Sequence, residues 1–315
     1  MTELGKDVRF FVEEAKAGDR RPERLQEVLN GQTLELLEQK GWGVSIATLG
    51  LENSETADRT GLVLHNAFKG HKNVPFTLWI AGCEGDYWTD PLRDPTLGKT
   101  KAKIAQAESW ADYYRIPVSG IGLDIEPSLG ESREMNKGLR NLGIVAWRRI
   151  HSLRRMEKLS RLGNSGENPF QALADLVNDL EVKNLKPEVY VAPTDILRKA
   201  LGLIVPEKTN VFTMVYTCSM PKVVARAVLT GLVKIPGLLK PKEHIAFGNV
   251  SSTGKDSGVD FEGGNLLPGG GGPKELIRDI RIFRLAGGDL SQFRVFALTG
   301  PEIVQATMDA LASNS

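Results

Sequence analysis

Cysteine is scarce in this chain, which has two, Cys83 and Cys218, among its 315 residues. Two cysteines cannot build the disulfide framework of a small secreted protein, so the sequence predicts reduced thiols. The opening residues, MTELGKDVRFFVEEAK, lack the basic segment and apolar run of a secretory signal. No apolar run reaches the ~18 residues that span a bilayer. These absences predict a cytoplasmic protein without a transmembrane segment.

Histidine is also scarce, and neither sign of charge is in clear excess. No two of the four histidines have the i, i+4 spacing of a zinc helix, and there is no CxxC pair, so we expect no metal and no cofactor. Forty basic residues face 39 acidic ones, giving a formal charge of +1. This balance predicts no nucleic-acid partner. The expected partner is a small-molecule or carbohydrate substrate, and the oligomeric state stays open.

Apolar runs and helical patterns alternate eight times along the chain. Continuous apolar runs, rather than alternating ones, indicate strands buried on both faces. The predicted strands are residues 8–12, 43–49, 75–81, 118–125, 188–192, 211–216, 244–250 and 293–298. The predicted helices are residues 23–39, 54–69, 99–114, 132–184 with a break at 162–169, 194–201, 221–234, 273–285 and 301–311.

Eight such units in about 300 residues predict an α/β fold, a single (β/α)8 barrel, also called a TIM barrel, over residues 1–315. A doubly wound open sheet is the alternative, because periodicity does not reveal whether a sheet closes. Two segments exceed ordinary connections. Residues 129–186 are expected to form a helical insertion, and the Gly-rich residues 251–272 form a loop after the seventh strand. That loop is interpreted as an active-site lid, a phosphate site or a solvated linker.

Carboxylates and hydroxyls dominate the C-terminal ends of the predicted strands, where barrel enzymes carry their active sites. The residues at these ends are Glu13, Glu14, Thr48, Glu84, Asp86, Asp124, Glu126, Asp195, Tyr216, Thr217, Asn249 and Thr299. Because histidine is absent from this set, it argues against a Ser-His-Asp site and favours acid/base catalysis by carboxylates, as in glycoside hydrolysis. The candidate substrate-binding residues are Glu84, Asp86, Asp195, Thr217 and Asn249.

Asp124 and Glu126 form the sharpest local feature, in the segment GIGLDIEP at residues 120–127. Side chains of a strand alternate between its faces, so both carboxylates point into the barrel opening, about 6–7 Å apart, with Gly122 below them. Two such groups do not ionise independently. One can keep its proton near neutral pH and act as a general acid on a glycosidic oxygen. The alternative is that both cap the next helix or bind a rim arginine.

The same segment resembles the strand-four signature of the chitinase-like barrels of glycoside hydrolase family 18, Asp-Gly-x-Asp-x-Asp-x-Glu. Here residues 119–126 read SGIGLDIE, so Asp124 and Glu126 match, whereas Ser119 and Gly122 replace the two earlier aspartates. The MVYT segment at residues 214–217 resembles the family's strand-six Met-x-Tyr-Asp, with Thr217 in place of the aspartate. The tryptophan expected at the end of strand eight is missing.

The resemblance implies specific roles for three residues. Glu126 would be the general acid/base, Asp124 would orient a substrate acetamide, and Tyr216 would hydrogen-bond the same acetamide. In that family the acetamide replaces the enzyme nucleophile. Gly122 replaces an aspartate that would tune the pKa of Asp124, and Thr217 replaces an aspartate that would bind sugar. Both replacements argue against chitin as the substrate.

Two further segments have candidate binding roles. Trp88 follows the third strand, and we interpret it as a surface for stacking on a sugar or as a loop aromatic packed on its own scaffold. Residues 148–161, RRIHSLRRMEKLSR, predict an amphipathic helix with a solvated basic face. A partner or an anionic membrane surface is the alternative for that face.

Three functions fit these patterns. The first is a glycoside-hydrolase-like barrel acting through Glu126. The second is a lyase, isomerase or cyclase that uses Asp124 and Glu126 on a non-sugar substrate. The third is a catalytically silent barrel that binds a ligand or partner. The fold alone does not choose among them.

Overall fold

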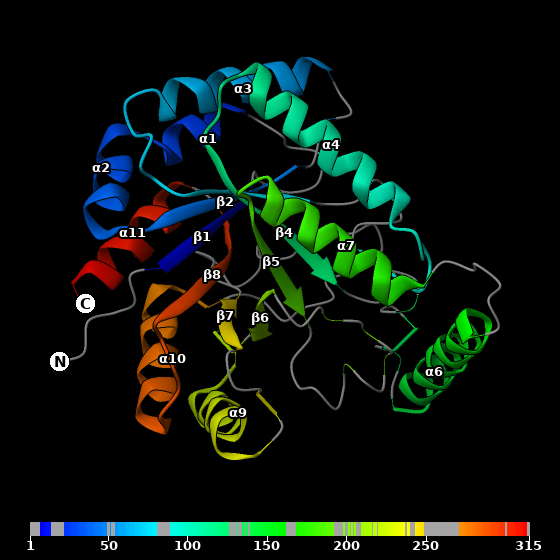
Figure 1. Cartoon of the computed structure of the whole chain (residues 1–315). Helices are drawn as coiled ribbons and strands as arrows, with labels where there is room; N and C mark the ends of the chain where they lie inside the picture. The colour runs from blue at the N-terminus through cyan, green and yellow to red at the C-terminus, as the bar shows by residue number, and fades with distance from the viewer. Residues whose placement is uncertain are drawn as a thin grey trace.

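The eight strands close into one parallel barrel in the order β1 to β8 (Figure 1). Every strand pairs in parallel with the next, and β8 pairs with β1, for example Phe10 with Val295. This pairing confirms the predicted barrel and excludes the open sheet. The strands are β1 (Asp7–Glu13), β2 (Gly43–Ala47), β3 (Phe76–Ile80), β4 (Val118–Ile125), β5 (Lys186–Val191), β6 (Asn210–Val215), β7 (His244–Gly248) and β8 (Gln292–Thr299).

This computed structural model describes part of the chain. The described residues are 7–13, 22–48, 51, 54–80, 89–125, 131, 134–135, 137, 139–161, 168–191, 198, 201, 203, 205, 209–215, 217–218, 220–236, 238–239, 243–248, 271–299 and 301–313. Most of the predicted 251–272 loop lies outside them, as does most of the predicted helix 194–201.

Helices surround the barrel, and α6 stands apart from this ring on the side toward which β4 and β5 point (Figure 1). The helices are α1 (Pro22–Val28), α2 (Gly31–Lys40), α3 (Ser54–Phe68), α4 (Gly98–Tyr113), α6 (Leu139–Arg161), α7 (Pro169–Val182), α9 (Lys222–Lys234), α10 (Pro273–Ala286) and α11 (Pro301–Ala312). Within the described residues, none of them combines the length and apolar character that a membrane crossing requires.

The predicted helix 23–39 is wrong in one respect, because it is two helices, α1 and α2. Asn30 separates them: its backbone is extended, with φ −74° and ψ 168°, and its side-chain oxygen accepts from the Thr33 amide at 3.0 Å. An asparagine in this geometry caps a new helix. Gly41 ends α2 in the left-handed region at φ 66°, a conformation that glycine adopts readily.

The interior of the barrel holds a layer of large aromatic side chains. Phe11 packs against Tyr190 and Trp79 at ring-centroid distances of 4.8 and 5.4 Å, and Trp79 also contacts Phe296. Gly122 makes room for this layer, because a Cβ there would lie 3.1 Å from Tyr190. The alternate residues of β4, Ile121, Leu123 and Ile125, belong to the core between sheet and helices. The aromatic layer therefore separates the two ends of the barrel interior.

Candidate functional site

Asp124 lies on the inward face of β4, one residue before the strand ends. It pairs across the sheet with Tyr190, whose ring belongs to the interior aromatic layer, and Asp124 itself is 2% exposed. Gly122, two residues earlier, points the same way toward Tyr190 and Trp79. The structure therefore places a buried carboxylate beyond the aromatic layer, at the C-terminal end of the barrel.

Thr217 is the other candidate site residue that the structure describes. It follows β6 and is completely buried. Its carbonyl oxygen accepts from the Arg278 guanidinium at 3.1 Å and from the Met220 amide at 2.9 Å, which ties the end of β6 to α10. Its role in substrate binding stays a prediction. The remaining candidates lie outside the described residues, namely Glu84, Asp86, Trp88, Glu126, Asp195, Tyr216 and Asn249.

The rim beside Asp124 is fastened by a buried arginine. The Thr89 amide donates to the Asp124 carbonyl at 2.8 Å, so the chain after β3 runs along the end of β4. The next residue, Asp90, accepts two hydrogen bonds from Arg149 of α6, at 2.8 and 2.9 Å. Arg149 also contacts Glu131 at 2.8 Å and donates to the Leu201 carbonyl. One side chain thus joins the connections that follow β3, β4 and β5.

The charge on Arg149 is stabilised by its partners. Burial by itself would lower the pKa of this guanidinium, but the hydrogen bonds and negative charges of Asp90 and Glu131 raise it above the ordinary value. A bidentate arginine–carboxylate pair also fixes the orientation of the two groups relative to each other, because it has two parallel hydrogen bonds. The rim is therefore positioned by this contact, which sequence reasoning missed.

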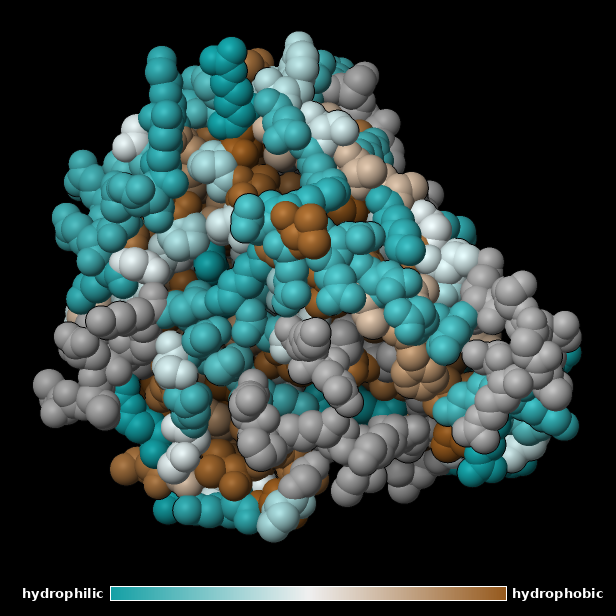
Figure 2. Space-filling model, in the orientation of Figure 1, coloured by the Kyte–Doolittle hydropathy of each residue, from teal (hydrophilic) through white to brown (hydrophobic). Residues whose placement is uncertain are grey.

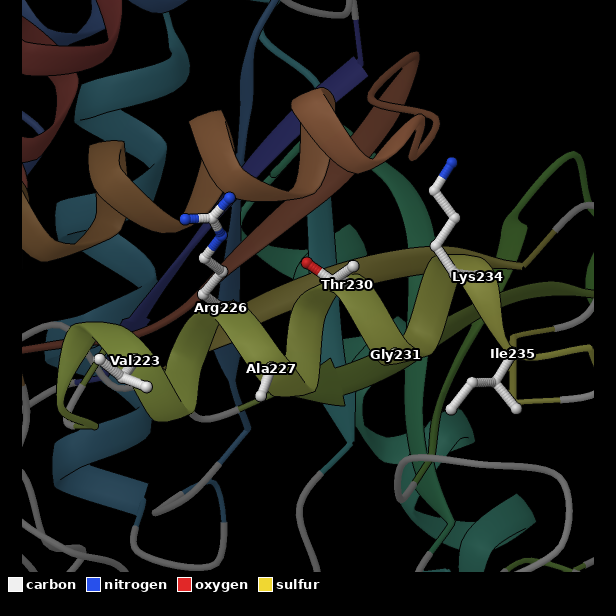
Figure 3. Close-up of a pocket in the computed structure, with 7 residues that line it drawn as sticks. All are labelled: Val223, Arg226, Ala227, Thr230, Gly231, Lys234 and Ile235. Carbon is white, nitrogen blue, oxygen red and sulfur yellow. The ribbon is translucent and has the colours of Figure 1, made fainter.

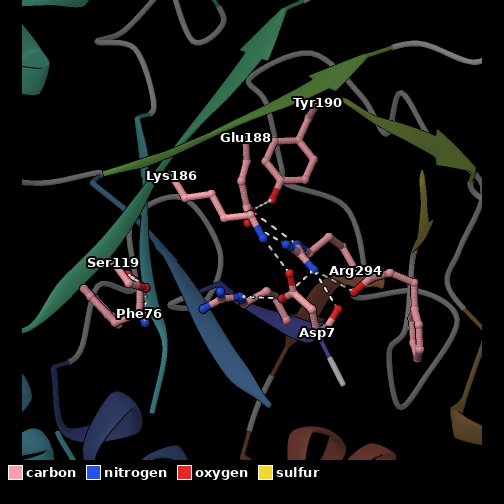
Figure 4. A network of polar contacts seen from close by, with 9 residues as sticks. Asp7, Phe76, Ser119, Lys186, Glu188, Tyr190 and Arg294 are labelled. Carbon is pink, nitrogen blue, oxygen red and sulfur yellow. Dashed lines mark hydrogen bonds and ion pairs between the residues drawn. The ribbon is translucent and has the colours of Figure 1, made fainter. Parts of the chain in front are cut away.

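The opposite end of the barrel interior holds a network of paired charges (Figure 4). Arg294 of β8 donates to both carboxylate oxygens of Glu188 on β5, and the Tyr190 hydroxyl donates to Glu188 at 2.6 Å. Asp7 of β1 accepts from Lys186 at 2.6 Å and from Arg9 at 3.2 Å. Arg294 and Glu188 are fully buried.

These contacts fix the protonation states of the network. Burial would raise the pKa of Glu188, yet the charge and hydrogen bonds of Arg294 outweigh it and hold that pKa below the ordinary value. Asp7 behaves alike, with Arg294, Arg9 and Lys186 outweighing burial to lower its pKa. Burial and the Glu188 charge raise the pKa of the Tyr190 hydroxyl. Glu188 is ionised and Tyr190 neutral, so this network stabilises the barrel rather than transferring protons.

A signal for this network was present in the sequence. Arg9 and Arg294 interrupt otherwise apolar strands, and Glu188 is the first residue of the predicted fifth strand, residues 188–192. Charged residues inside buried strands need partners of opposite sign. The carboxylate partners of Arg294 lie more than 100 residues away in the chain, so the sequence alone does not reveal the pairing.

A shallow groove on α9 does not resemble a catalytic site (Figure 3). It is formed by one helix and its C-terminal flank, and its lining residues are Val223, Arg226, Ala227, Thr230, Gly231, Lys234 and Ile235. It contains two cations and no carboxylate, so it offers no acid/base pair. Among the described residues, no three His, Cys, Asp or Glu side chains come together where they could hold a metal ion.

Comparisons with known proteins found similarity in structure and none in sequence. No family model and no curated protein matches the sequence. A Prevotella bryantii endo-beta-mannanase/endo-beta-glucanase is similar with a TM-score of 0.48 and 10% identity, over 98% of this chain and 48% of that one. The carboxyl transferase domain of Rhizobium etli pyruvate carboxylase gives 0.37 and 8%, over 98% and 47%. This chain spans about half the length of each, and no conclusion about it rests on likeness at this level.

Proposed function

We propose that this protein is an acid/base enzyme that acts at the C-terminal end of its barrel on a glycoside or amino-sugar-containing substrate. The observation that supports the proposal is the position of Asp124, a buried carboxylate on the inward face at the end of β4. Active sites of closed (β/α)8 barrels lie at this end, whereas charges at the other end serve stability.

Glu126 is the proposed general acid/base. If the strand alternation continues past β4, its side chain lies on the same face as Asp124, about 6–7 Å further along. The negative charge of Asp124 then disfavours ionisation of Glu126, which keeps a proton available for the leaving oxygen. Met214 of β6 lies in the interior aromatic layer, and if the strand alternation continues past Val215, Tyr216 is the next inward position. We propose that its hydroxyl and Asp124 orient a substrate acetamide.

A non-hydrolytic acid/base reaction on the same scaffold is the second candidate. Two positions that carry aspartates in chitinase-like barrels have packing roles here. The Ser119 hydroxyl accepts from the Phe76 amide and donates to the Phe76 carbonyl, both at 3.0 Å. Gly122 makes space for Tyr190. These replacements favour a reaction that keeps the acid/base pair without the surrounding sugar-binding carboxylates.

A panel of aryl glycosides, including N-acetylated amino sugars, tests the proposal through the pH dependence of kcat/KM. Glu126→Gln should lower turnover by about 10²–10⁴-fold, the usual contribution of a general acid. Glu181→Gln, on the exposed side of α7, is the matched control and should leave turnover unchanged. Full activity of Glu126→Gln removes this residue from the mechanism, and a complete absence of glycoside turnover in the unmodified protein removes the glycosidase reaction.

A further inference from the structure

The strongest unexplained feature of the surface is the positive charge of α6. This helix of 23 residues carries seven Lys or Arg and one Glu, a formal charge of +6, whereas the whole chain carries +1. The remainder of the molecule is therefore net negative. Such a concentration of one charge on one helix is an electrostatic attractor for an anionic ligand.

The apolar side of α6 is already occupied by the protein. Val145 is fully buried, and Leu142, Ala146 and Leu153 pack against the main core. Arg149, on the same side, makes the buried contact with Asp90. A helix that lies in a membrane surface turns its apolar side to the lipid. Because that side of α6 faces the protein, a membrane is the less suitable occupant.

The opposite side of α6 is a stripe of exposed cations around one exposed indole, which we call the α6 ridge. Its residues are Arg140, Trp147, His151, Arg154, Arg155 and Lys158, all exposed. Spacings of seven, four, three and four residues place Arg140, Trp147, His151, Arg154 and Lys158 on one helix face. From Arg140 to Lys158 this face is about 27 Å long. Figure 2 shows mostly hydrophilic atoms over α6, at the lower right.

Trp147 and His151 form an aromatic platform in the middle of the α6 ridge. Trp147 is 67% exposed, and its ring lies 5.6 Å from that of His151 at an angle of 35°. An indole this exposed is unusual, since tryptophan is buried in most folded proteins. Among the residues that the structure describes, Arg140, Arg154, Arg155 and Lys158 form no ion pair, in contrast to Arg148, which pairs with Glu134 at 3.0 Å.

We propose that the α6 ridge binds a carboxylate-bearing polysaccharide, which makes an acidic polysaccharide the substrate class of the site. This inference rests on the proposed function. Guanidinium groups pair with carboxylates through two parallel hydrogen bonds. The aromatic platform offers a large apolar face with a polar edge, which suits one face of a sugar ring. The length of the ridge suits a polymer better than a single sugar.

The connection between the ridge and the rim favours a substrate over an unrelated ligand. Arg149 fastens α6 to Asp90, and the neighbouring Thr89 bonds the carbonyl of Asp124. The helix that carries the ridge is therefore anchored to the rim of the proposed site. Nucleic acid is less suitable, because its phosphates carry one charge per about 1.7 Å of duplex, a density that the few cations of the α6 ridge do not match.

Binding of polygalacturonate oligomers, measured by calorimetry on the full chain at low salt, tests the proposal separately from catalysis. Trp147→Ala, and the double variant Arg154→Gln with Lys158→Gln, should each weaken binding about tenfold or more. Two matched controls should bind as the unmodified protein does. Tyr113→Ala removes another exposed aromatic, and Lys222→Gln with Arg226→Gln removes two exposed cations of α9. Added salt should weaken binding, since exposed charges are screened.

Several results overturn the proposal. Equal affinity for polygalacturonate and neutral mannan does so, as does unchanged binding by the ridge variants when their circular dichroism matches that of the unmodified protein. Binding to single-stranded DNA or to phosphatidylserine vesicles, without polygalacturonate binding, replaces it by another partner. Ridge-dependent binding without any turnover contradicts the proposed function alone, whereas turnover of neutral glycosides without polygalacturonate binding contradicts the ridge alone.

Discussion

The two ends of the barrel interior use carboxylates in opposite ways. At the N-terminal end, Glu188 is enclosed by Arg294 and the Tyr190 hydroxyl, and it remains ionised. At the C-terminal end, Asp124 lies above a glycine and beside the Tyr190 ring, next to the rim fastened by Arg149. Both carboxylates are almost fully buried. A buried acid on a barrel strand therefore indicates structure or chemistry according to which end it occupies.

The aromatic layer keeps these two ends apart. Phe11, Trp79 and Tyr190 fill the interior between Glu188 and the end of β4. Substitutions at one end should consequently leave the properties of the other end intact. The following experiments use that independence, beginning with the largest expected effect.

Replacing Asp124 should separate activity from stability. Asp124→Asn should lower turnover by about 10²–10⁴-fold, since it disables one half of the proposed acid/base pair. In the proposed mechanism the charge of Asp124 disfavours ionisation of Glu126, so its removal should move the alkaline limit of the pH–rate profile to lower pH. The thermal midpoint should stay within a few degrees. If Asp124→Asn unfolds much of the protein but the folded fraction keeps its specific activity, Asp124 has a structural role and no catalytic one.

Replacing Glu188 should do the reverse. Glu188→Gln removes the nearest counter-charge of the buried Arg294 guanidinium and, among the described residues, leaves only Asp7 beside it, and the free energy of unfolding should fall by about 3–5 kcal/mol. Replacing both partners, Glu188→Leu with Arg294→Met, should recover most of that loss because neither charge of the buried pair is left without the other. Urea titrations measure both effects. If the double variant is as unstable as the single one, the loss of stability does not come from the unpaired charge of Arg294.

The same network predicts how stability depends on pH. The pKa of Glu188 is lowered in the folded protein, so the unfolded chain binds more protons in the interval below the ordinary value of 4.5. The stabilisation that comes from Glu188 should therefore be complete above that pH. As the pH falls below it, the free energy of unfolding should decline by about 1.4 kcal/mol per pH unit for each such carboxyl. Asp7, whose pKa is also lowered, should add to this decline. The double variant should show a shallower decline in urea titrations at several pH values.

The smallest expected effect is that of one hydroxyl. Tyr190→Phe removes a hydrogen bond to Glu188, while Arg294 continues to bond the same carboxylate. The cost should be about 1–2 kcal/mol of unfolding free energy. Glycoside turnover should not change, because the hydroxyl points away from Asp124 into the N-terminal network. A large loss of turnover would show that the two ends are coupled through Tyr190.

The sequence predicted the barrel because eight runs of buried strand residues alternate with amphipathic helices. It did not predict the break at Asn30, since the apolar spacing of α1 and α2 continues across it and only the capping contact interrupts it. The network around Glu188 required pairing charges from β1, β5 and β8, which lie far apart in the chain. The role of Arg149 was not predictable for a similar reason. It lies in a run of basic residues, and nothing in its local sequence marks it as a buried arginine. Asp124 was correctly placed on an inward face, whereas its companions Glu126 and Tyr216 stay predictions.

Closure of the barrel through β1 and β8 also has a consequence for synthesis in the cell. Phe10 pairs with Val295, so the first strand to leave the ribosome must wait for the last. At translation rates of about 5–20 residues per second, that interval is roughly 15–60 s. During it, the edge of β1 and the rings of Phe10 and Phe11 have no β8 to pair with. Nascent chains of this protein should therefore depend on chaperones until β8 has emerged, and truncation before β8 should cause aggregation.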